Sequence, residues 1–388
     1  MKFSKNILAL TVCSVIATPV MAEDVNVKMS NGGLKISQGD SSIQFGGRFM
    51  LDYDRFDGAN NVANNGDSGS DSEIRRGRIY IKSKFDKVWE AKLQININDA
   101  KNQANFEDAY LKYSGLSVGS ITVGKHKEAF GLEELTSSKY ITTIERSMMT
   151  NAFAPGRSYG VSLSGKKGDF TYNGGLFEVS QDESNQESYA LTGRLTYAPV
   201  NKQGNVIHFG LAASVRDYGN QAYQIKERAE VHTANDKAAV SATTNNTDNV
   251  NIVGFEAAGV WGPLSLQTEY QQAAVSGSQG SADADYSGYY IMGSYFLTGD
   301  SRPYKNGAFG KVKPSSTSGA WELVTRFSNL DVVDNNSGTK TENITLGVNY
   351  YANANVRFMM NYISTDVSGT EVSITDGDAV SLRAQYIF

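Results

Sequence analysis

Apolar and polar side chains alternate one by one along most of this chain. Near its start, Ile43, Phe45, Phe49 and Leu51 are apolar residues separated by even numbers of positions. Arg48 and Asp52 occupy positions of the opposite parity. Successive side chains of a β-strand point to opposite faces, so a period of two predicts strands with one apolar and one polar face. The same period continues through residues 378–388. Such strands need an apolar medium on one side and water on the other.

The first 22 residues have the pattern of a secretory signal. Lys2 and Lys5 precede an apolar run over residues 7–16, and Val20-Met21-Ala22 has the form of a cleavage site. The single cysteine, Cys13, falls in this segment, so we expect neither disulfides nor thiolate sites in the mature chain. After residue 22 nothing approaches the roughly 18 consecutive apolar residues that a membrane helix needs, which excludes a helical membrane protein.

Counting the alternating segments and the turns between them gives about 16 strands, an even number as single-chain outer-membrane barrels require. Their expected spans are 41–57, 73–85, 88–99, 105–113, 117–125, 157–165, 169–180, 186–198, 204–218, 250–260, 264–274, 285–298, 319–331, 341–352, 354–366 and 378–388. Connections at one end are short and those at the other are long and polar, as in such barrels. A closed barrel also leaves no strand edge unpaired in lipid.

We therefore predict an all-β fold, a 16-stranded antiparallel transmembrane β-barrel, over residues 41–388, with residues 23–40 as an N-terminal periplasmic segment. A soluble β-sandwich also alternates and is the competing fold. The signal segment, the length without a visible domain boundary, and the aromatic residue Phe388 at the end of an alternating strand favour the barrel.

Composition limits the chemistry that this chain can perform. It has 21 Tyr, 17 Phe and 38 Gly but 3 His and 1 Cys, and its net charge is −5. Tyr and Phe suit strands and membrane-interface girdles. His126, His208 and His232 have no Ser or Asp at a spacing typical of a catalytic triad, so we expect no enzyme. No cofactor, structural metal or nucleic-acid partner is indicated.

If the apolar face meets lipid, charged residues of the strands face the lumen, because Arg or Lys near the membrane midplane costs roughly 2–4 kcal/mol. Such residues either balance acids on the wall or bind a solute. The inward candidates are Arg48, Arg76, Arg78, Lys82, Arg194, Arg326, Arg357 and Arg383.

The stretch 125–160 is the longest in the first half that lacks the period of two, and we expect it to fold into the lumen as a constriction loop. It supplies Ser137, Ser138, Lys139, Arg146 and Arg157, and the run SEIRRGRIYIK places Arg75, Arg76 and Arg78 within four positions. Guanidinium groups donate paired hydrogen bonds and hydroxyls complete the shell, so these residues together suit an oxyanion.

The chain also resembles a known family in several stretches: GRFMLDYDRFDG, EIRRGRIYIKSKF, FEDAYLKYSG, KEAFGLEELTSSKYITTIERSMMTNAFAPGRSYGV, SYFLTGDSRPYKNGAFGKVKP, GAWELVTRFSNLD and TLGVNYYANANVRFMMNYI. These resemble the phosphate- and polyphosphate-selective outer-membrane porins of the porin O/P family. The resemblance implies a homotrimer of 16-stranded barrels in the bacterial outer membrane. It also implies that segments 125–157, 218–250 and 298–318 fold inward.

Carried over by position, the family's anion site would use Arg75, Arg76, Ser137, Ser138, Lys139 and Arg146, with Asp108 as the carboxylate that orients the basic groups. We add Arg78, from the same run as Arg75 and Arg76, to the candidate constriction residues. Further pore-lining residues would be Arg48, Lys226, Arg228, Lys305, Lys311 and Lys313. The resemblance departs at the fifth loop. Family members that are most selective for phosphate carry a ladder of arginines there, whereas AYQIKERAEVH has only Lys226 and Arg228 among acids.

The leading hypothesis is passive diffusion of small anions, phosphate or polyphosphate among them, across the outer membrane. The alternatives are a weakly selective porin for general solutes, a barrel enzyme, and an adhesin with a plugged lumen. A net negative charge does not oppose the first, because the local field of a constriction sets selectivity. The expected partners are anionic solutes, outer-membrane lipid and lipopolysaccharide.

Overall fold

The computed structural model describes residues 25–30, 32–98, 103–179, 188–234, 236–370 and 372–388 of the chain. The expected signal segment, with Cys13, lies outside the described residues. No helix in the described ranges is both long enough and apolar enough to cross a membrane.

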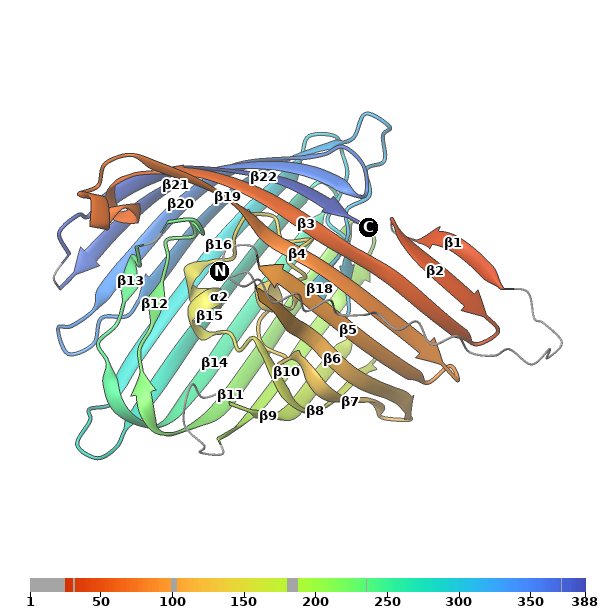
Figure 1. Ribbon diagram of the computed structural model, residues 1–388, viewed down its shortest axis with the longest axis horizontal. Helices are drawn as coiled ribbons and strands as arrows, with labels where there is room; N and C mark the ends of the chain where they lie inside the picture. The colour runs from red at the N-terminus through yellow and green to blue at the C-terminus, as the bar shows by residue number, and fades with distance from the viewer. Residues whose placement is uncertain (1–24, 31, 99–102, 180–187, 235, 371) are drawn as a thin grey trace, which may run out of the picture.

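Sixteen long strands form one closed antiparallel barrel (Figure 1), which confirms the predicted fold class. Each strand pairs with the next along the chain, and β22 pairs with β3 to close the wall. The barrel strands are β3 (Ser41–Phe56), β4 (Gly69–Phe85), β5 (Trp89–Asn98), β6 (Gln103–Leu116), β7 (Gly119–Lys127), β8 (Arg157–Lys167), β9 (Phe170–Glu178), β10 (Tyr189–Lys202), β11 (Asn205–Tyr223), β14 (Thr244–Trp261), β15 (Leu264–Gly277), β16 (Ala284–Phe296), β19 (Ala320–Asp331), β20 (Thr339–Tyr351), β21 (Val356–Gly369) and β22 (Asp376–Ile387).

The two faces of the strands have opposite environments, as the alternation predicts. On β20, Ile344 and Leu346 on the outer face are each 53% exposed, whereas Asn343 and Thr345 on the inner face are each 1% exposed. The buried polar side chains of the wall meet polar loops inside the barrel, where they find hydrogen-bond partners. Lipid on one side and a polar interior on the other therefore account for the repeat.

The turns at one end of the barrel are short, except for the long connection between β16 and β19. Between β4 and β5 the chain reverses at Asp86 and Lys87, both with positive φ (50° and 59°), which matches the twist of the flanking strands. At the other end, β11 and β14 extend further than expected, to Tyr223 and from Thr244, and shorten the loop between them.

An N-terminal hairpin precedes the barrel. It consists of β1 (Asn26–Ser30) and β2 (Gly33–Gln38), which pair with each other, and β2 also pairs with the first residues of β3. Figure 1 shows the hairpin projecting beyond one end of the barrel. The two strands of this segment were not expected from the sequence.

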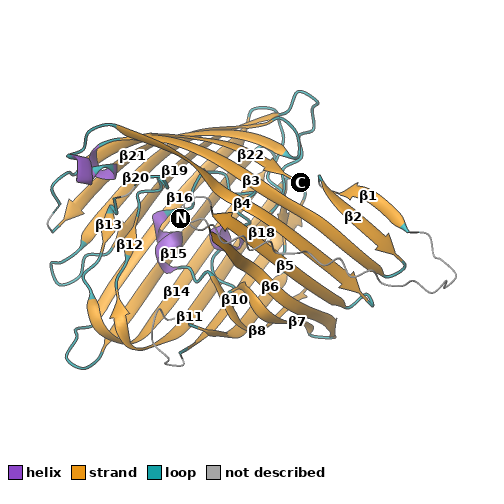
Figure 2. Cartoon of the chain, viewed as in Figure 1, coloured by secondary structure: helices purple, strands orange, loops and turns teal. Residues whose placement is uncertain are grey.

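Three connections carry structure of their own. The constriction loop, residues 128–156, contains α1 (Leu132–Leu135) and α2 (Met148–Phe153), drawn in purple in Figure 2. The fifth loop, residues 224–243, contains β12 (Lys226–Glu227) and β13 (Ala239–Val240). The long turn, residues 297–319, contains β17 (Tyr304–Lys305) and β18 (Ala308–Phe309). The loop after β3 adds two short 3-10 helices, η1 (Gly58–Asn60) and η2 (Val62–Asn64).

Candidate functional site

The constriction loop is fastened to one half of the barrel wall, formed by β15 and β19 to β22. Glu269 of β15 accepts hydrogen bonds from the backbone N–H groups of Leu132 (2.8 Å) and Glu133 (2.7 Å) at the start of α1. Asn361 of β21 accepts from the N–H of Ile144 at 2.7 Å. Backbone carbonyls of the loop accept from Asn349, Arg357, Arg383 and Gln385. These wall residues fix the path of the loop.

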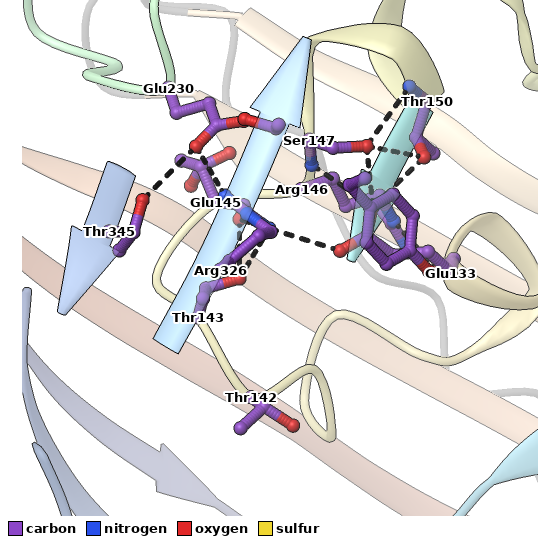
Figure 3. A network of polar contacts seen from close by, with 12 residues as sticks. Glu133, Thr142, Thr143, Glu145, Arg146, Ser147, Thr150, Glu230, Arg326 and Thr345 are labelled. Carbon is purple, nitrogen blue, oxygen red and sulfur yellow. Dashed lines mark hydrogen bonds and ion pairs between the residues drawn. The ribbon is translucent and has the colours of Figure 1, made fainter. Parts of the chain in front are cut away.

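A buried arginine on β19 ties the constriction loop to the fifth loop (Figure 3). Arg326 lies 3.2 Å from Glu133 of the constriction loop and 2.5 Å from Glu230 of the fifth loop. Glu133 also accepts from the N–H and the hydroxyl of Ser147, both at 3.0 Å, at the start of α2. Glu230 accepts from the N–H of Met148 at 3.1 Å, so the two loops are also in direct contact.

The fifth loop continues from this contact to the opposite wall. Thr233 donates its hydroxyl to Asp54 of β3 at 2.8 Å, and His232 contacts Glu73 of β4. The carbonyl of Ala229 accepts from Asn343 of β20. Because the fifth loop connects β11 to β14 and contacts β3 and β4 on the far side of the closed barrel, it lies across the lumen next to the constriction loop.

A second buried arginine cluster holds the middle of the constriction loop. Arg383 of β22 lies between Asp52 (2.5 Å) and Glu145 (2.7 Å), and Arg75 donates two hydrogen bonds of 2.9 Å to Glu145. Burial opposes ionisation of Glu145, but Arg75, Arg76 and Arg383 outweigh it and keep the pKa of this carboxyl well below its usual value. Glu145 is therefore a fixed anion within the barrel.

A β-bulge explains why the side chains of two consecutive arginines, Arg75 and Arg76, both point into the barrel. Met50 pairs with Arg76 and Leu51 pairs with Ile74, so Arg75 has no partner in the register of β3 and β4. A bulge inserts one extra residue into a strand and breaks its alternation. Arg75 thus turns to Glu145 of the constriction loop, while Arg76 stays on the regular inner face.

A cavity lies on the other side of the constriction loop, against the wall formed by β3 to β8. Its volume is about 490 Å³, and it is lined by Gln44, Arg48, Arg76, Arg78, Tyr80, Lys82, Lys92, Gln94, Asp108, Tyr110, His126, Lys127, Leu135, Ser137, Ser138, Lys139, Arg146 and Arg157. Nine of these residues are Lys or Arg, and Asp108 is the one acid among the described lining residues. We call this space the basic cavity.

Seven of the nine cations have a carboxylate within 4 Å. The pairs are Arg76–Glu145, Arg78–Glu107, Lys82–Glu90, Lys92–Asp108, Lys127–Glu134 and Arg146–Glu134, and Arg157 contacts both Glu107 and Asp108. Their charges are partly neutralised, and their head groups are held in place.

Arg48 and Lys139 have no carboxylate partner among the described residues. Arg48 is 5% exposed; its Nη1 donates to the hydroxyl of Ser137 at 3.3 Å, and its buried Nε has no hydrogen-bond partner there. The Lys139 ammonium lies 5.8 Å from the centre of the Tyr80 ring and 5.4 Å from that of Tyr140. Two cations beside a hydroxyl, without a carboxylate among the described residues, make this the candidate anion position of the cavity.

The surroundings of Lys139 also change its acidity. Burial, and the positive charges of Arg48, Lys92 and Lys311, lower the pKa of Lys139 to about 7. The charge of this residue therefore changes near neutral pH.

Most of the expected constriction residues come together in the basic cavity. Arg76, Arg78, Asp108, Ser137, Ser138, Lys139 and Arg146 line it, as does Arg48. Arg75 does not line it, because its guanidinium binds Glu145. Arg146 lines it but donates to three backbone carbonyls of its own loop, those of Glu133, Glu134 and Thr136, so it also shapes that loop.

The other expected pore-lining residues lie elsewhere. Lys226 and Arg228 do not line the basic cavity, and Arg228 donates to the carbonyl of Ala234 within the fifth loop. Lys305 and Lys313 do not line it either. Lys311 borders a small space of about 20 Å³ beside Lys139. Of this group, Lys311 is thus placed next to the candidate anion position.

The long turn enters the barrel from the end opposite to the fifth loop. The guanidinium of Arg302 stacks on the ring of Phe309 at 3.6 Å, and the N–H of Phe309 donates to the hydroxyl of Thr136 in the constriction loop at 3.2 Å. Arg194 of β10 donates to the carbonyl of Gly307 at 2.8 Å. Arg302 therefore supports the turn and is itself buried.

Sequence reasoning did not single out Lys92 and Lys127 as cavity residues. The alternation does place Lys92 on the polar face of its strand with Gln94, so that signal was present. Lys127 is the last residue of β7, where strand and loop meet, and periodicity ends there. Within the described ranges, no group of His, Cys, Asp and Glu is arranged to hold a metal ion.

Comparison with known proteins agrees with this architecture. The chain is 30% identical over 415 aligned positions to Porin O of Pseudomonas aeruginosa, covering 94% of this chain and 93% of that protein. Among solved structures it resembles an anion-selective porin from Comamonas acidovorans, with a TM-score of 0.61 and 14% identity over 90% of this chain and 100% of that one. It also resembles the trimer form of OmpT from Vibrio cholerae, with a TM-score of 0.57 and 12% identity over 90% and 100% of the two chains.

The model of the family described as phosphate-selective porin O and P matches residues 43–388, which is nearly the whole barrel. The two solved structures are too distant in sequence to show more than the fold, whereas the family match and the relative at 30% identity rest on sequence. The chain belongs to the porin O and P family of outer-membrane porins.

Proposed function

We propose that this porin passes small anions through the outer membrane and that the basic cavity selects them. The observation that carries this proposal is the lining of nine Lys or Arg residues with a single carboxylate, that of Asp108, among the described lining residues. The description of the family as phosphate-selective supports it, as does the anion-selective porin among the structural neighbours.

The arrangement acts by concentrating anions rather than by trapping them. One cation is worth roughly 4 kcal/mol to an anion at about 4 Å in an effective dielectric near 20, before desolvation is counted. A channel needs a site that attracts its solute and still releases it. Most of the cavity cations are paired with carboxylates, which weakens the positive electrostatic potential that an entering anion meets. The net charge of −5 is compatible with this, because the local field sets selectivity.

Within the cavity, Arg48, Ser137 and Lys139 form the proposed primary contact. An oxyanion there would accept from the guanidinium, the hydroxyl and the ammonium together. Ser138 and Arg76 line the same cavity and would extend the set of donors along the path.

The fifth loop favours a second candidate, a weakly selective porin for general solutes. Its two cations, Lys226 and Arg228, do not line the basic cavity, and its Glu230 is committed to Arg326. Selectivity for phosphate over other anions would then depend on the basic cavity alone. We further propose a homotrimer, supported by the family resemblance and by the trimeric form of a structural neighbour.

Planar-bilayer recording of the purified protein tests the proposal. In a gradient of KCl the reversal potential should favour chloride, and millimolar phosphate should reduce the chloride current. A reversal potential that favours potassium would overturn anion selectivity. Chloride preference without block by phosphate would instead support the weakly selective porin.

The titration of Lys139 makes the anion preference dependent on pH. Because the pKa of this ammonium is lowered to about 7, its charge is present below that pH and lost above it. We expect the chloride preference to fall by about twofold or more between about pH 6 and pH 8. Chloride is the probe because its own charge does not change with pH.

The matched variant is Lys139→Arg, whose guanidinium stays charged throughout this range. It should show a smaller loss of chloride preference from acidic to alkaline pH than the natural protein. Identical pH profiles for the variant and the natural protein would show that another group titrates.

A further inference from the structure

A second bulge places two consecutive acids inside the barrel. Gln94 of β5 pairs with Asp108, and Ile95 pairs with Phe106, so Glu107 has no partner in the register of β5 and β6. Phe106 is 54% exposed on the outer face, whereas the carboxylates of Glu107 and Asp108 both reach guanidinium groups of the cavity wall. The bulge therefore adds a negative charge that regular alternation would have placed toward lipid.

Glu107 lies behind the cavity lining and joins two of its cations. One carboxylate oxygen is 2.5 Å from Nη2 of Arg78, and the other is 2.9 Å from Nη1 of Arg157. Arg157 is also held by Asp108 through Nε at 2.7 Å. Both arginines line the cavity, whereas Glu107 does not. Its charge acts on the cavity through these two guanidinium groups.

We infer that Glu107 is a positioning residue that shortens the stay of an anion in the basic cavity, an inference that rests on the proposed function. The guanidinium groups of Arg78 and Arg157 are each paired with Glu107 and also line the basic cavity. An anion that enters must compete with a carboxylate already in place, so it binds more weakly and leaves sooner. The bulged acid thus keeps a strongly cationic cavity permeable.

The geometry separates this role from that of Asp108. Asp108 faces the cavity and pairs with Lys92 at 2.5 Å, so its removal changes the lining itself. Glu107 can be neutralised without altering the shape of the cavity, because Gln has nearly the same size and its amide oxygen still accepts from one guanidinium.

The test is the phosphate concentration that halves the chloride current in planar bilayers. Glu107→Gln should lower this concentration several-fold and lengthen individual blocking events, with little change in chloride preference. Glu107→Asp keeps the charge and should resemble the natural protein. Glu342→Gln removes an acid that pairs with Lys340 outside the cavity lining and controls for net charge.

The outcomes separate this inference from the proposed function. If phosphate does not block the natural protein, the proposed function loses its phosphate component. If phosphate blocks the natural protein and Glu107→Gln equally, or blocks the variant less, the role given to Glu107 is overturned. Migration of the unheated proteins on gels checks that each variant forms a folded barrel, and Glu107→Asp retains the test of charge should the amide variant fail to fold.

Discussion

Replacing Arg48 by Glu is expected to abolish the preference for anions or to reverse its sign. Arg48 is buried at the edge of the basic cavity without a carboxylate partner in the described part of the chain, so its charge is available to a passing anion. The substitution replaces one positive charge by one negative charge at the proposed primary contact. At an effective dielectric near 20, each such charge is worth roughly 4 kcal/mol at about 4 Å.

The measurement is the reversal potential in a KCl gradient. Folding should survive, because Arg48 lies directly across from Arg78 in the pairing of β3 and β4, and a carboxylate there would face a cation. Arg55→Glu is the matched control, since Arg55 belongs to the same strand but is exposed and lies outside the cavity lining. An unchanged reversal potential for Arg48→Glu would place the selecting site elsewhere.

Arg48 is a sharper target than Arg146 for this experiment. Arg146 also lines the cavity, but its guanidinium donates to three carbonyls of the constriction loop. Its replacement would disturb the loop and the charge together, and the two effects would not be separable.

The barrel itself could be predicted from the sequence because its environment has two sides. Each strand meets lipid on one face and a polar interior on the other, so every second residue reports its surroundings. The last strand illustrates this: residues 378–388 were expected and β22 spans Asp376–Ile387. The hairpin β1–β2 was missed because it lies before the barrel, outside that two-sided setting.

The site could be predicted only in part, because its decisive features break the alternation. The doubled arginines at positions 75 and 76 gave a visible signal, but the bulge that turns Arg75 to Glu145 depends on a partner 70 residues away. Glu145 itself carries no local signal in the segment TTIERS. Pairwise contacts between a loop and a distant strand are fixed by the closed fold and not by neighbouring residues.

The same reason explains why the roles of the inward arginines could not be predicted from the sequence. Arg326 and Arg383 were expected on the inner face and are found there. Arg326 is paired with acids of the constriction loop and the fifth loop, and Arg383 with acids of the wall and the constriction loop. Alternation shows which face a side chain takes. It does not show whether a loop covers that face, which decides between an anchor and a solute contact.

Replacing Arg326 by Met is expected to release the constriction loop and the fifth loop together. The substitution leaves Glu133 and Glu230 buried without their cation, and breaking a buried ion pair in this way costs about 3–5 kcal/mol. The strands of the closed barrel keep their hydrogen bonds, so the loss falls on the two loops. The backbone N–H of Ser147 donates to Glu133, and that of Met148 donates to Glu230. Hydrogen exchange at these two N–H groups should become faster.

Conductance provides the second readout. Because the constriction loop borders the basic cavity, the variant should show larger and noisier chloride currents with a weaker preference for anions. The matched control is Arg194→Met, which removes another buried cation, paired with Glu256, that contacts neither Glu133 nor Glu230 in the described part of the chain. It should leave exchange at Ser147 unchanged.

A compensating variant tests whether charge is the cause. Arg326→Met combined with Glu133→Gln and Glu230→Gln removes the cation and both buried anions, and replacing a whole buried ion cluster is often nearly neutral. The triple variant should recover slow exchange at Ser147 and Met148 to a large extent. If Arg326→Met alone already exchanges as slowly as the natural protein, the hydrogen bonds that the loop donates to Glu269 and Asn361 of the wall are sufficient to hold it, and Arg326 is not the tie between the two loops.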